Sequence, residues 1–418
     1  MKKKIMMMSC LLLSIASFSQ TEPVDSNALE KRITEIEETL KENKNFKVSG
    51  YIQTQFQFGE QFSALKVGAS NDNKNKTINR VGIRRGRIKF TYEKGIVAGV
   101  FQLDITEKGI GIKDAYLNIK DPWLKSMALK AGVFDRPFGS EISYSSSQRE
   151  APERSTIFQT LFPEERDLGL MLTLQAPKTS IWNILKLEAG LFAGNGIKME
   201  TDNRKDFIGH LSFNHTIKDI LKIGGGISYY NGGVYQGSKN IYTMKGNSFV
   251  LNNDSTNIGK YAKREYIGFD MQINAITKVG TTKLMAEYLM GTQPGTNKDS
   301  KSPNASTLPT SDTYIRKFKG GYIMLTQDFG KVPLTGVFKY DWYNPNKNVS
   351  KDNIGLNQTN KGDISYNTFG LGMVWKATSS IRVTAFYDIV RNETTNNITD
   401  YNQNRKDNVF TLRFQYKF

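Results

Sequence analysis

The chain has 418 residues, with 57 Lys and Arg against 40 Asp and Glu, so its formal net charge is +17. Hydrophobic residues make up 38% and the mean hydropathy is −0.46, which excludes a membrane protein built from spanning helices. The single cysteine excludes a disulfide framework, while 36 glycines and only 11 prolines suit many long strands.

The first twenty residues have the features of an export signal. Three lysines at positions 2–4 precede an apolar run at 5–16, and "SFSQT" offers a cleavage context near Gln20. Cys10 lies within this run, which is too short to span a membrane. An exported chain without spanning helices is either a secreted soluble protein or an outer-membrane β-barrel. A barrel is apolar on one face only, so its average hydropathy is ordinary.

A helix is predicted next, within "NALEKRITEIEETLKENKN" at 27–45. Leu29, Ile33, Ile36 and Leu40 are spaced as in the apolar seam of a coiled coil. We therefore expect residues 21–46 to form a periplasmic coiled-coil segment that joins identical chains beneath a trimer. The alternative is an amphipathic helix that lies on its own domain.

From Lys47 onward, apolar and polar residues alternate with the period of two that is typical of strands. In "KVSGYIQTQFQF", Ile52, Phe56 and Phe58 share one face and three glutamines share the other. Sixteen such segments follow one another: 47–58, 80–93, 95–106, 112–120, 126–136, 167–176, 181–192, 205–217, 218–230, 261–274, 281–291, 314–328, 334–343, 364–376, 380–392 and 407–418.

The connections between these segments alternate in length. Short turns such as "EKG", "DPWLK" and "KATSS" alternate with long polar loops, and the even number of strands brings both ends of the barrel to the same side. The pattern predicts an all-β fold, a transmembrane antiparallel β-barrel over 47–418 in the outer membrane of a Gram-negative bacterium. The last strand would pair with the first, and its terminal Phe418 resembles the C-terminal assembly signal of outer-membrane proteins.

A sixteen-stranded barrel is wide enough for an aqueous channel, so the inward side chains decide what passes. Alternation directs Arg85, Arg87, Asp104 and Lys130 into the lumen, with few acidic side chains beside the basic ones. Positive groups in a pore attract anions and exclude cations. The expected partners are therefore small anionic solutes and membrane lipid, and no nucleic acid. The alternative is a general or sugar-conducting porin, in which these charges only solvate the wall.

The loop at 137–166 is the expected constriction. It carries more apolar residues than a loop in water needs, among them Phe138, Phe158 and Phe162, so it should fold into the lumen. Basic residues in and beside the loop alternate with glutamates, and three of them are candidate pore residues: Arg136, Arg149 and Arg154.

Several motifs resemble, in order, those of the phosphate-selective porin O and P family: "SGYIQTQFQF", "GIRRGRIKF", "DAYLNIK", "AGVFDRPFG", "ERS" and "ERDLG". The resemblance implies a homotrimer of sixteen-stranded barrels with an arginine-lined constriction for phosphate or polyphosphate. The family's arginine pair falls on Arg84 and Arg85, its pore-facing aspartate on Asp104 and its loop arginine on Arg154. Where phosphate-selective members have a lysine after the "FG" motif, this chain has Ile142, and Phe58 stands near a first-strand arginine of theirs.

Neighbouring residues of a strand face opposite sides, so Arg84 and Arg85 both face the lumen only if a bulge turns one of them. An outer-membrane enzyme is the first rival class. The two histidines, His210 and His215, should lie on opposite faces of one strand, and no hydrolase, metalloprotease or redox motif is present. We expect no enzyme, no cofactor and no metal site. A structural adhesin or periplasmic tether is the third class, which a plugged lumen would favour.

Overall fold

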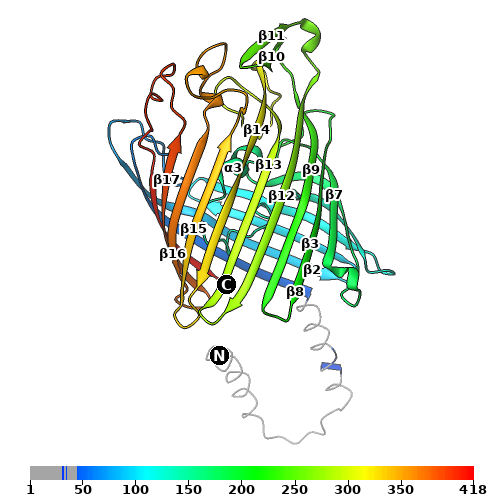
Figure 1. Ribbon diagram of the computed structural model, residues 1–418. Coiled ribbons are helices and arrows are strands. Elements are labelled where there is room, and N and C mark those ends of the chain that lie inside the picture. Colours follow the sequence, from blue (N-terminus) through cyan, green and yellow to red (C-terminus); the bar gives the residue numbers. More distant parts are fainter. Residues whose placement is uncertain (1–30, 33, 35–44) are drawn as a thin grey trace, which may run out of the picture. The chain divides into compact units, whose positions relative to one another are not determined.

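A computed structural model describes residues 31, 32, 34 and 45–418. The predicted signal peptide and nearly all of the predicted coiled coil lie outside the described residues. From Val48 onward the chain forms one unit, a β-sheet that closes on itself. Figure 1 shows it as a tall barrel of tilted strands, with the blue and cyan strands at the rear and β16 and β17 at the left of the view.

Sixteen antiparallel strands make the barrel wall, each paired with its neighbours in the chain, and β9 pairs directly with β12. The wall strands are β1 (Phe46–Gly59), β2 (Ile78–Lys94), β3 (Val97–Thr106), β4 (Gly109–Lys120), β5 (Met127–Asp135), β6 (Arg166–Gln175), β7 (Leu185–Phe192), β8 (Asp206–Ile217), β9 (Leu221–Tyr235), β12 (Tyr261–Thr277), β13 (Gly280–Gly295), β14 (Thr313–Asp328), β15 (Leu334–Asn344), β16 (Tyr366–Trp375), β17 (Ile381–Asn392) and β18 (Val409–Lys417). Each of the sixteen predicted segments corresponds to one of these strands, so the predicted fold class is confirmed.

Among the described residues, seven short elements lie outside the wall. A hairpin of β10 and β11 rises from the connection between β9 and β12, where the sequence predicted only a loop, and it pairs in parallel with the start of β14. Figure 1 shows this hairpin above the barrel rim. The elements are β10 (Asn240–Lys245), β11 (Ser248–Asn253), α3 (Thr156–Leu161) and the single-turn helices η1 (Ile181–Ile184), η2 (Ser255–Asn257), η3 (Lys351–Asn353) and η4 (Lys361–Asp363).

The first and last strands close the barrel, as predicted. Their antiparallel register pairs Ile52 with Tyr416 and Phe58 with Phe410. On β18, Phe414 and Tyr416 are exposed on the outer face, whereas Thr411, Arg413 and Gln415 are buried on the inner face. The alternation at the end of the sequence therefore separates a lipid face from a luminal face.

Connections at one end of the barrel are short turns, and at the other end they are long loops (Figure 1). The hairpin between β3 and β4 is an exception at the loop end, because only Glu107 and Lys108 connect the two strands. Short turns face the periplasm and long loops face the exterior in outer-membrane barrels. The loop end is therefore the extracellular end.

The outer surface of the wall is apolar. Large hydrophobic side chains that point outward stay exposed around the barrel, including Phe101, Leu191, Ile227 and Leu371. In a soluble protein so many exposed apolar side chains would be unfavourable, but hydrocarbon lipid solvates them. Among the described residues, no helix is long and apolar enough to cross a membrane.

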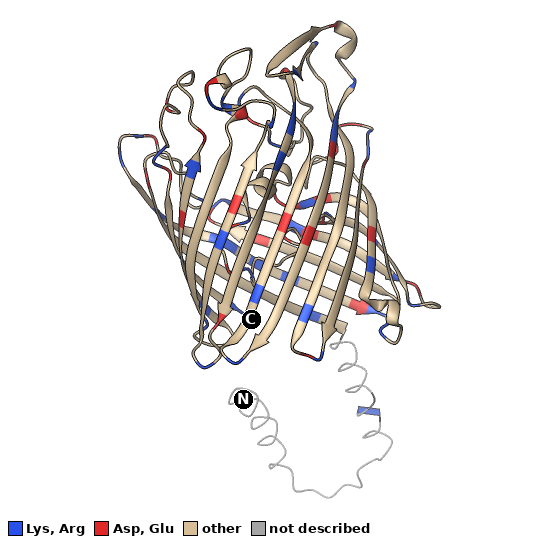
Figure 2. Ribbon diagram, viewed as in Figure 1, with Lys and Arg blue, Asp and Glu red and all other residues tan. Residues whose placement is uncertain are grey.

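The buried hydrophobic core lies inside the barrel, where side chains of the loop between β5 and β6 pack with side chains of the wall strands. Charged residues sit on the wall strands at mid-height (Figure 2). A second, smaller cluster lies among the extracellular loops. Val349, Ile354 and Ile364 of one loop pack there with Tyr401 of another, against Met244 of β10. The long loops are therefore packed against one another rather than separate.

Candidate pore constriction

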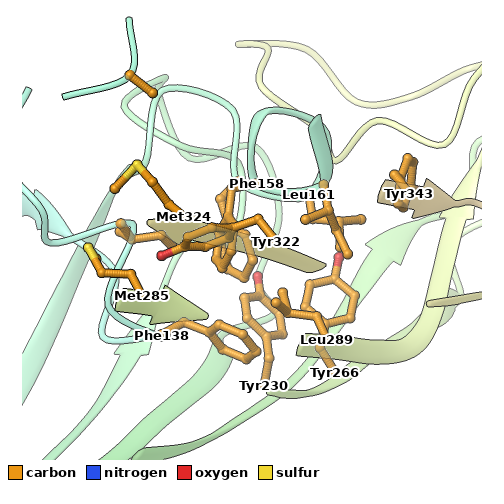
Figure 3. Packing of buried hydrophobic residues seen from close by; sticks show 14 of the residues in the cluster. Phe138, Phe158, Leu161, Tyr230, Tyr266, Met285, Leu289, Tyr322, Met324 and Tyr343 are labelled. Carbon is orange, nitrogen blue, oxygen red and sulfur yellow. The ribbon is translucent and has the colours of Figure 1, made fainter. Parts of the chain in front are cut away.

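The loop at 136–165 folds into the lumen and packs on the inner face of β12 to β15. Phe138, Phe158 and Phe162 are at most 1% exposed and form ring contacts with one another and with tyrosines of the wall. Figure 3 shows Phe138 and Phe158 of the loop among wall side chains that include Tyr266, Leu289 and Tyr322. α3 supplies the apolar face, because Ile157, Phe158 and Leu161 lie on one side of its turn and a half.

A hydrogen-bonded carboxylate fixes the start of this loop. Glu287 of β13 accepts from Ser140 Oγ at 2.7 Å, from the Glu141 backbone N–H at 2.6 Å and from Tyr322 Oη at 2.8 Å. Gly139 has a positive φ of 61°, and a Cβ at this position would collide with the Glu287 carboxylate. The glycine of the "FG" motif therefore allows both the turn and the close approach to β13.

The middle of the loop crosses to the opposite wall, where β1, β2, β17 and β18 meet. Ser146 Oγ bonds to Tyr51 Oη at 2.6 Å and accepts from Arg87 Nη1 at 2.9 Å. Arg413 of β18 donates to the Pro152 carbonyl at 2.7 Å, and Arg382 of β17 donates to the Gln148 and Arg149 carbonyls at 3.0 Å each. The loop therefore spans the lumen from one wall to the other.

Glu153 is the centre of the polar contacts on this side. Arg84 donates to both of its carboxylate oxygens, from Nε at 2.8 Å and from Nη2 at 2.9 Å. Arg85 donates to Oε2 at 3.1 Å and Arg413 to Oε1 at 2.8 Å. Burial alone would raise the pKa of Glu153, but these three guanidinium groups outweigh it and hold the pKa well below its usual range.

Glu165, at the end of the loop, collects a second set of three basic groups. It accepts from Arg154 Nη1, from Lys113 Nζ at 2.8 Å and from Arg166 Nη1 at 3.3 Å. Burial again opposes ionisation, and the neighbouring charges, Arg154 first, hold the pKa of Glu165 well below its usual range. Two loop carboxylates are thus each surrounded by three basic side chains.

Arg84 and Arg85 both reach the lumen, since both bind Glu153. Val81 and Ile83 are exposed on the outer face, as is Tyr92 further along β2, so the alternation shifts by one residue near the arginine pair. A second shift occurs in β4, where the β3–β4 register skips Lys113 and places it beside Asp114, both buried on the inside. Such bulges re-aim side chains next to functional sites.

The other predicted residues fall into three environments. Arg87 binds Asp104 at 3.2 Å on the inner wall, and Arg154 binds Glu165. Arg136 is completely buried beside Asp167, with 3.4 Å between Nε and the carboxylate, and lies over the Phe162 ring. Lys130 lies over the Tyr116 ring, with its Nζ 5.1 Å from the ring centre. Arg136 and Lys130 are therefore outside the group that surrounds the two carboxylates.

Arg149 differs from every other predicted residue. It is 3% exposed, and none of its three guanidinium nitrogens has a hydrogen-bond partner. A buried cation without a partner is costly unless an anion or water compensates it.

These side chains enclose a cavity of about 390 Å³ between the loop and β2 to β4. Seven basic side chains line it, against four acidic ones. The basic residues are Arg84, Arg85, Arg87, Lys113, Arg149, Arg154 and Lys301, and the acidic ones are Asp104, Glu153, Glu164 and Glu165. A second cavity of about 420 Å³ lies along β5 to β9, and Lys130 and Arg136 line that one instead.

Lys113, Arg166 and Arg413 contribute to the two charge clusters but are absent from the predicted set. The alternation of β18 already placed Arg413 on the luminal face, so a signal for it existed. No sequence signal marks the bulge that turns Lys113 inward. The expectation of few acidic neighbours is wrong, because the loop brings Glu153 and Glu165 to the wall.

The two histidines have different surroundings. His210 is buried and bonds to Asp270 at 2.9 Å, whereas His215 is exposed. Among residues 31, 32, 34 and 45–418, no group of three or more His, Cys, Asp or Glu side chains could hold a metal ion.

Comparison with known proteins gives matches in fold. No protein-family model and no curated relative matches the sequence. The structure is similar to OprB of Pseudomonas putida at high pH (TM-score 0.57, 10% identity, 91% of this chain and 96% of that chain). It is also similar to the outer membrane channel DcaP of Acinetobacter baumannii (0.54, 13%, 89% and 97%) and to the trimer form of OmpT, an outer membrane protein of Vibrio cholerae (0.51, 12%, 89% and 99%).

At these identities the likeness shows a shared barrel architecture. The closed sheet, the apolar outer face and the charged lumen are those of an outer-membrane barrel protein of Gram-negative bacteria.

Proposed function

We propose that this protein is a passive outer-membrane porin whose constriction favours small anions, with phosphate-type oxyanions as the preferred class. The observation that carries the proposal is the basic excess of the cavity between the loop and β2 to β4, seven basic side chains against four acidic. Positive groups along a pore compensate the lost hydration of an anion and repel cations. The unpartnered Arg149 adds support, because its guanidinium lacks a counter-charge.

The sequence resemblance supports the finer part of the proposal. The ordered motifs that resemble the phosphate-selective porin O and P family contain Arg84, Arg85 and Arg154, and the resemblance also assigns a pore-facing role to Asp104. All four side chains line this cavity. We extend the proposal to a homotrimer with an export signal at 1–20 and a coiled coil at 21–46. The trimer form of a similar barrel and the apolar spacing at 29–40 support this extension.

A general porin without anion preference is the second candidate. The observation that favours it is the extent of ion pairing, since Glu153 and Glu165 neutralise part of the charge of six basic side chains. The two candidates differ in the sign and size of the pore's charge selectivity.

The test is the reversal potential of purified protein in a planar bilayer under a salt gradient. We expect a reversal potential whose sign indicates anion preference. In Arg85→Ala this potential should shift towards zero, because the substitution removes a buried luminal cation. Lys376→Ala is the matched control, since Lys376 pairs with Asp328 at the periplasmic rim and should leave the potential unchanged. A wild-type potential of zero, or one that favours cations, would contradict the proposal in favour of the general porin.

A further inference from the structure

We propose that Glu153 is a built-in counter-anion that occupies the binding position for a permeating oxyanion, so that the solute must displace it to pass. The inference rests on the proposed function, and it assigns a specificity-determining role to a residue of the loop. Glu153 competes for the arginines that would otherwise hold the solute.

The geometry around Glu153 is that of a bound oxyanion. Arg84 forms a two-pronged contact with both carboxylate oxygens, and Arg85 and Arg413 each add a contact to one oxygen. Guanidinium groups hold carboxylates and phosphates in this way, with parallel N–H donors directed at two oxygens. Three such groups around a single carboxylate leave a surplus of positive charge at this position.

The contact is not required to hold the loop in the lumen. Phe138, Phe158 and Phe162 anchor the loop in the hydrophobic core, and Glu287 fixes its start through three hydrogen bonds. On the wall that carries the arginines, backbone carbonyl groups of the loop accept hydrogen bonds that do not involve the Glu153 side chain. The Gln148 and Arg149 carbonyls accept from Arg382, and the Pro152 carbonyl accepts from Arg413.

The carboxylate is also within reach of a solute. The Glu153 side chain is 16% exposed and that of Arg84 is 25% exposed, and both line the cavity that holds the basic excess. Arg149 lines the same cavity with all three guanidinium nitrogens unpartnered. The cavity is therefore lined by one guanidinium group without a partner and by the arginine group that Glu153 occupies.

The chemistry of displacement separates classes of anion. Phosphate has several oxygens and can take over the two-pronged contacts of Arg84 that the carboxylate leaves. Chloride is monatomic and cannot form such paired contacts. Glu153 therefore favours passage of oxyanions over chloride, because only an oxyanion replaces the contacts that the arginines lose.

The first variant is Glu153→Gln, which keeps the shape of the side chain and removes its charge. With inorganic phosphate as the probe, we measure the concentration that blocks half of the chloride current in a planar bilayer. We expect this concentration to fall by about tenfold, since one competing charged hydrogen-bond acceptor has been removed. The reversal potential should shift further towards anion preference.

Glu150→Gln is the matched control. It removes the same charge from the same loop, but Glu150 pairs with Lys283 and Tyr144 and lines a different cavity on the periplasmic side. Its half-blocking phosphate concentration should stay at the wild-type value. Glu153→Asp keeps the charge and withdraws it by one methylene, so it should strengthen block by less than Glu153→Gln. This variant preserves the test if Glu153→Gln does not fold.

Two outcomes would overturn the inference. If Glu153→Gln and the wild type are blocked equally, Glu153 does not compete with the solute. If Glu153→Gln conducts more and loses phosphate block, Glu153 only secures the loop. Either result leaves the proposed function intact as long as the wild type is anion-selective and Arg85→Ala is not. A wild type without anion preference would instead overturn the proposed function itself.

Discussion

Residues 136–165 contact the barrel wall on two sides, and the two contacts are made of different chemistry. On β12 to β15 the loop buries Phe138, Phe158 and Phe162 among apolar and aromatic side chains. On β1, β2 and β18 it presents Ser146 and Glu153 to arginines and glutamines. Apolar burial does not depend on the ionisation of the side chains involved, whereas ion pairs are screened by salt and change with pH. The apolar contact is thus suited to positioning the loop, and the charged contact to recognising solutes.

Among the substitutions that test this difference between the apolar and the charged contact, we expect the largest effect at Phe158. Replacing it with alanine removes a ring that is 1% exposed and that contacts Phe162 and Tyr322. We expect a loss of about 3 to 5 kcal/mol in the free energy of unfolding, because the substitution leaves a cavity. Thermal or denaturant unfolding in detergent measures it, and single-channel conductance should rise as the loop loosens.

Leu356→Ala is the control for this substitution, since Leu356 is an exposed residue of an extracellular loop. It should change stability by no more than about 0.5 kcal/mol. Equal losses in the two variants would show that the apolar contact does not position the loop.

An intermediate effect is expected on the charged side, at Ser146. Its hydroxyl bonds to Tyr51 and accepts from Arg87, and all three residues are buried. Ser146→Ala should therefore cost about 1 to 3 kcal/mol in unfolding free energy, since it leaves a buried donor with fewer partners. The same unfolding assay checks this value. A loss as large as that of Phe158→Ala would mean that both contacts position the loop equally.

The smallest effect is expected from pH, because Glu153 and Glu165 should cause no change in the reversal potential near the ordinary pKa of a glutamate. A carboxyl whose pKa is lowered in the folded state stays ionised as the pH falls past its ordinary pKa of about 4.3, and its stabilising contribution is lost only near the lowered value. Because Glu153 and Glu165 have such pKa values, neither should contribute a transition to the reversal potential between pH 7 and about pH 4.3. A transition centred near pH 4.3 would show that the two carboxylates are not held by the arginines.

The alternation of the sequence was sufficient to predict the barrel. Every wall strand has one face towards lipid and one towards the lumen. The alternation of apolar and polar residues in β1 and β18, for example, follows directly from this difference in solvation. The sequence could show only that Arg84 and Arg85 need a bulge to share the lumen. The bulge at Lys113 could not be located, because a bulge changes pairing without a fixed residue type. The hairpin of β10 and β11 was missed for a similar reason, since its strands are short and lie outside the membrane pattern.

The candidate site was predicted in its residue types but not in its pairing. Arg84, Arg85 and Arg154 do lie together around one cavity. Which acidic group each of them meets depends on the path of the loop, and that path is set by the packing of Phe138 and Phe158 on the far wall. Short-range patterns carry no information about such contacts, which join residues many positions apart.

The packing of the extracellular loops has a practical consequence for labelling the protein at the cell surface. Val349, Ile354 and Tyr401 share one small core, and Thr395 and Asn397 donate hydrogen bonds to carbonyls of the neighbouring loop. An epitope tag or fluorophore inserted into either of these loops would disturb both. The loop between β1 and β2 is different, because residues 72–77 are exposed and contribute nothing to that core. Insertions there should leave the mouth of the pore unchanged and display the tag to the outside medium.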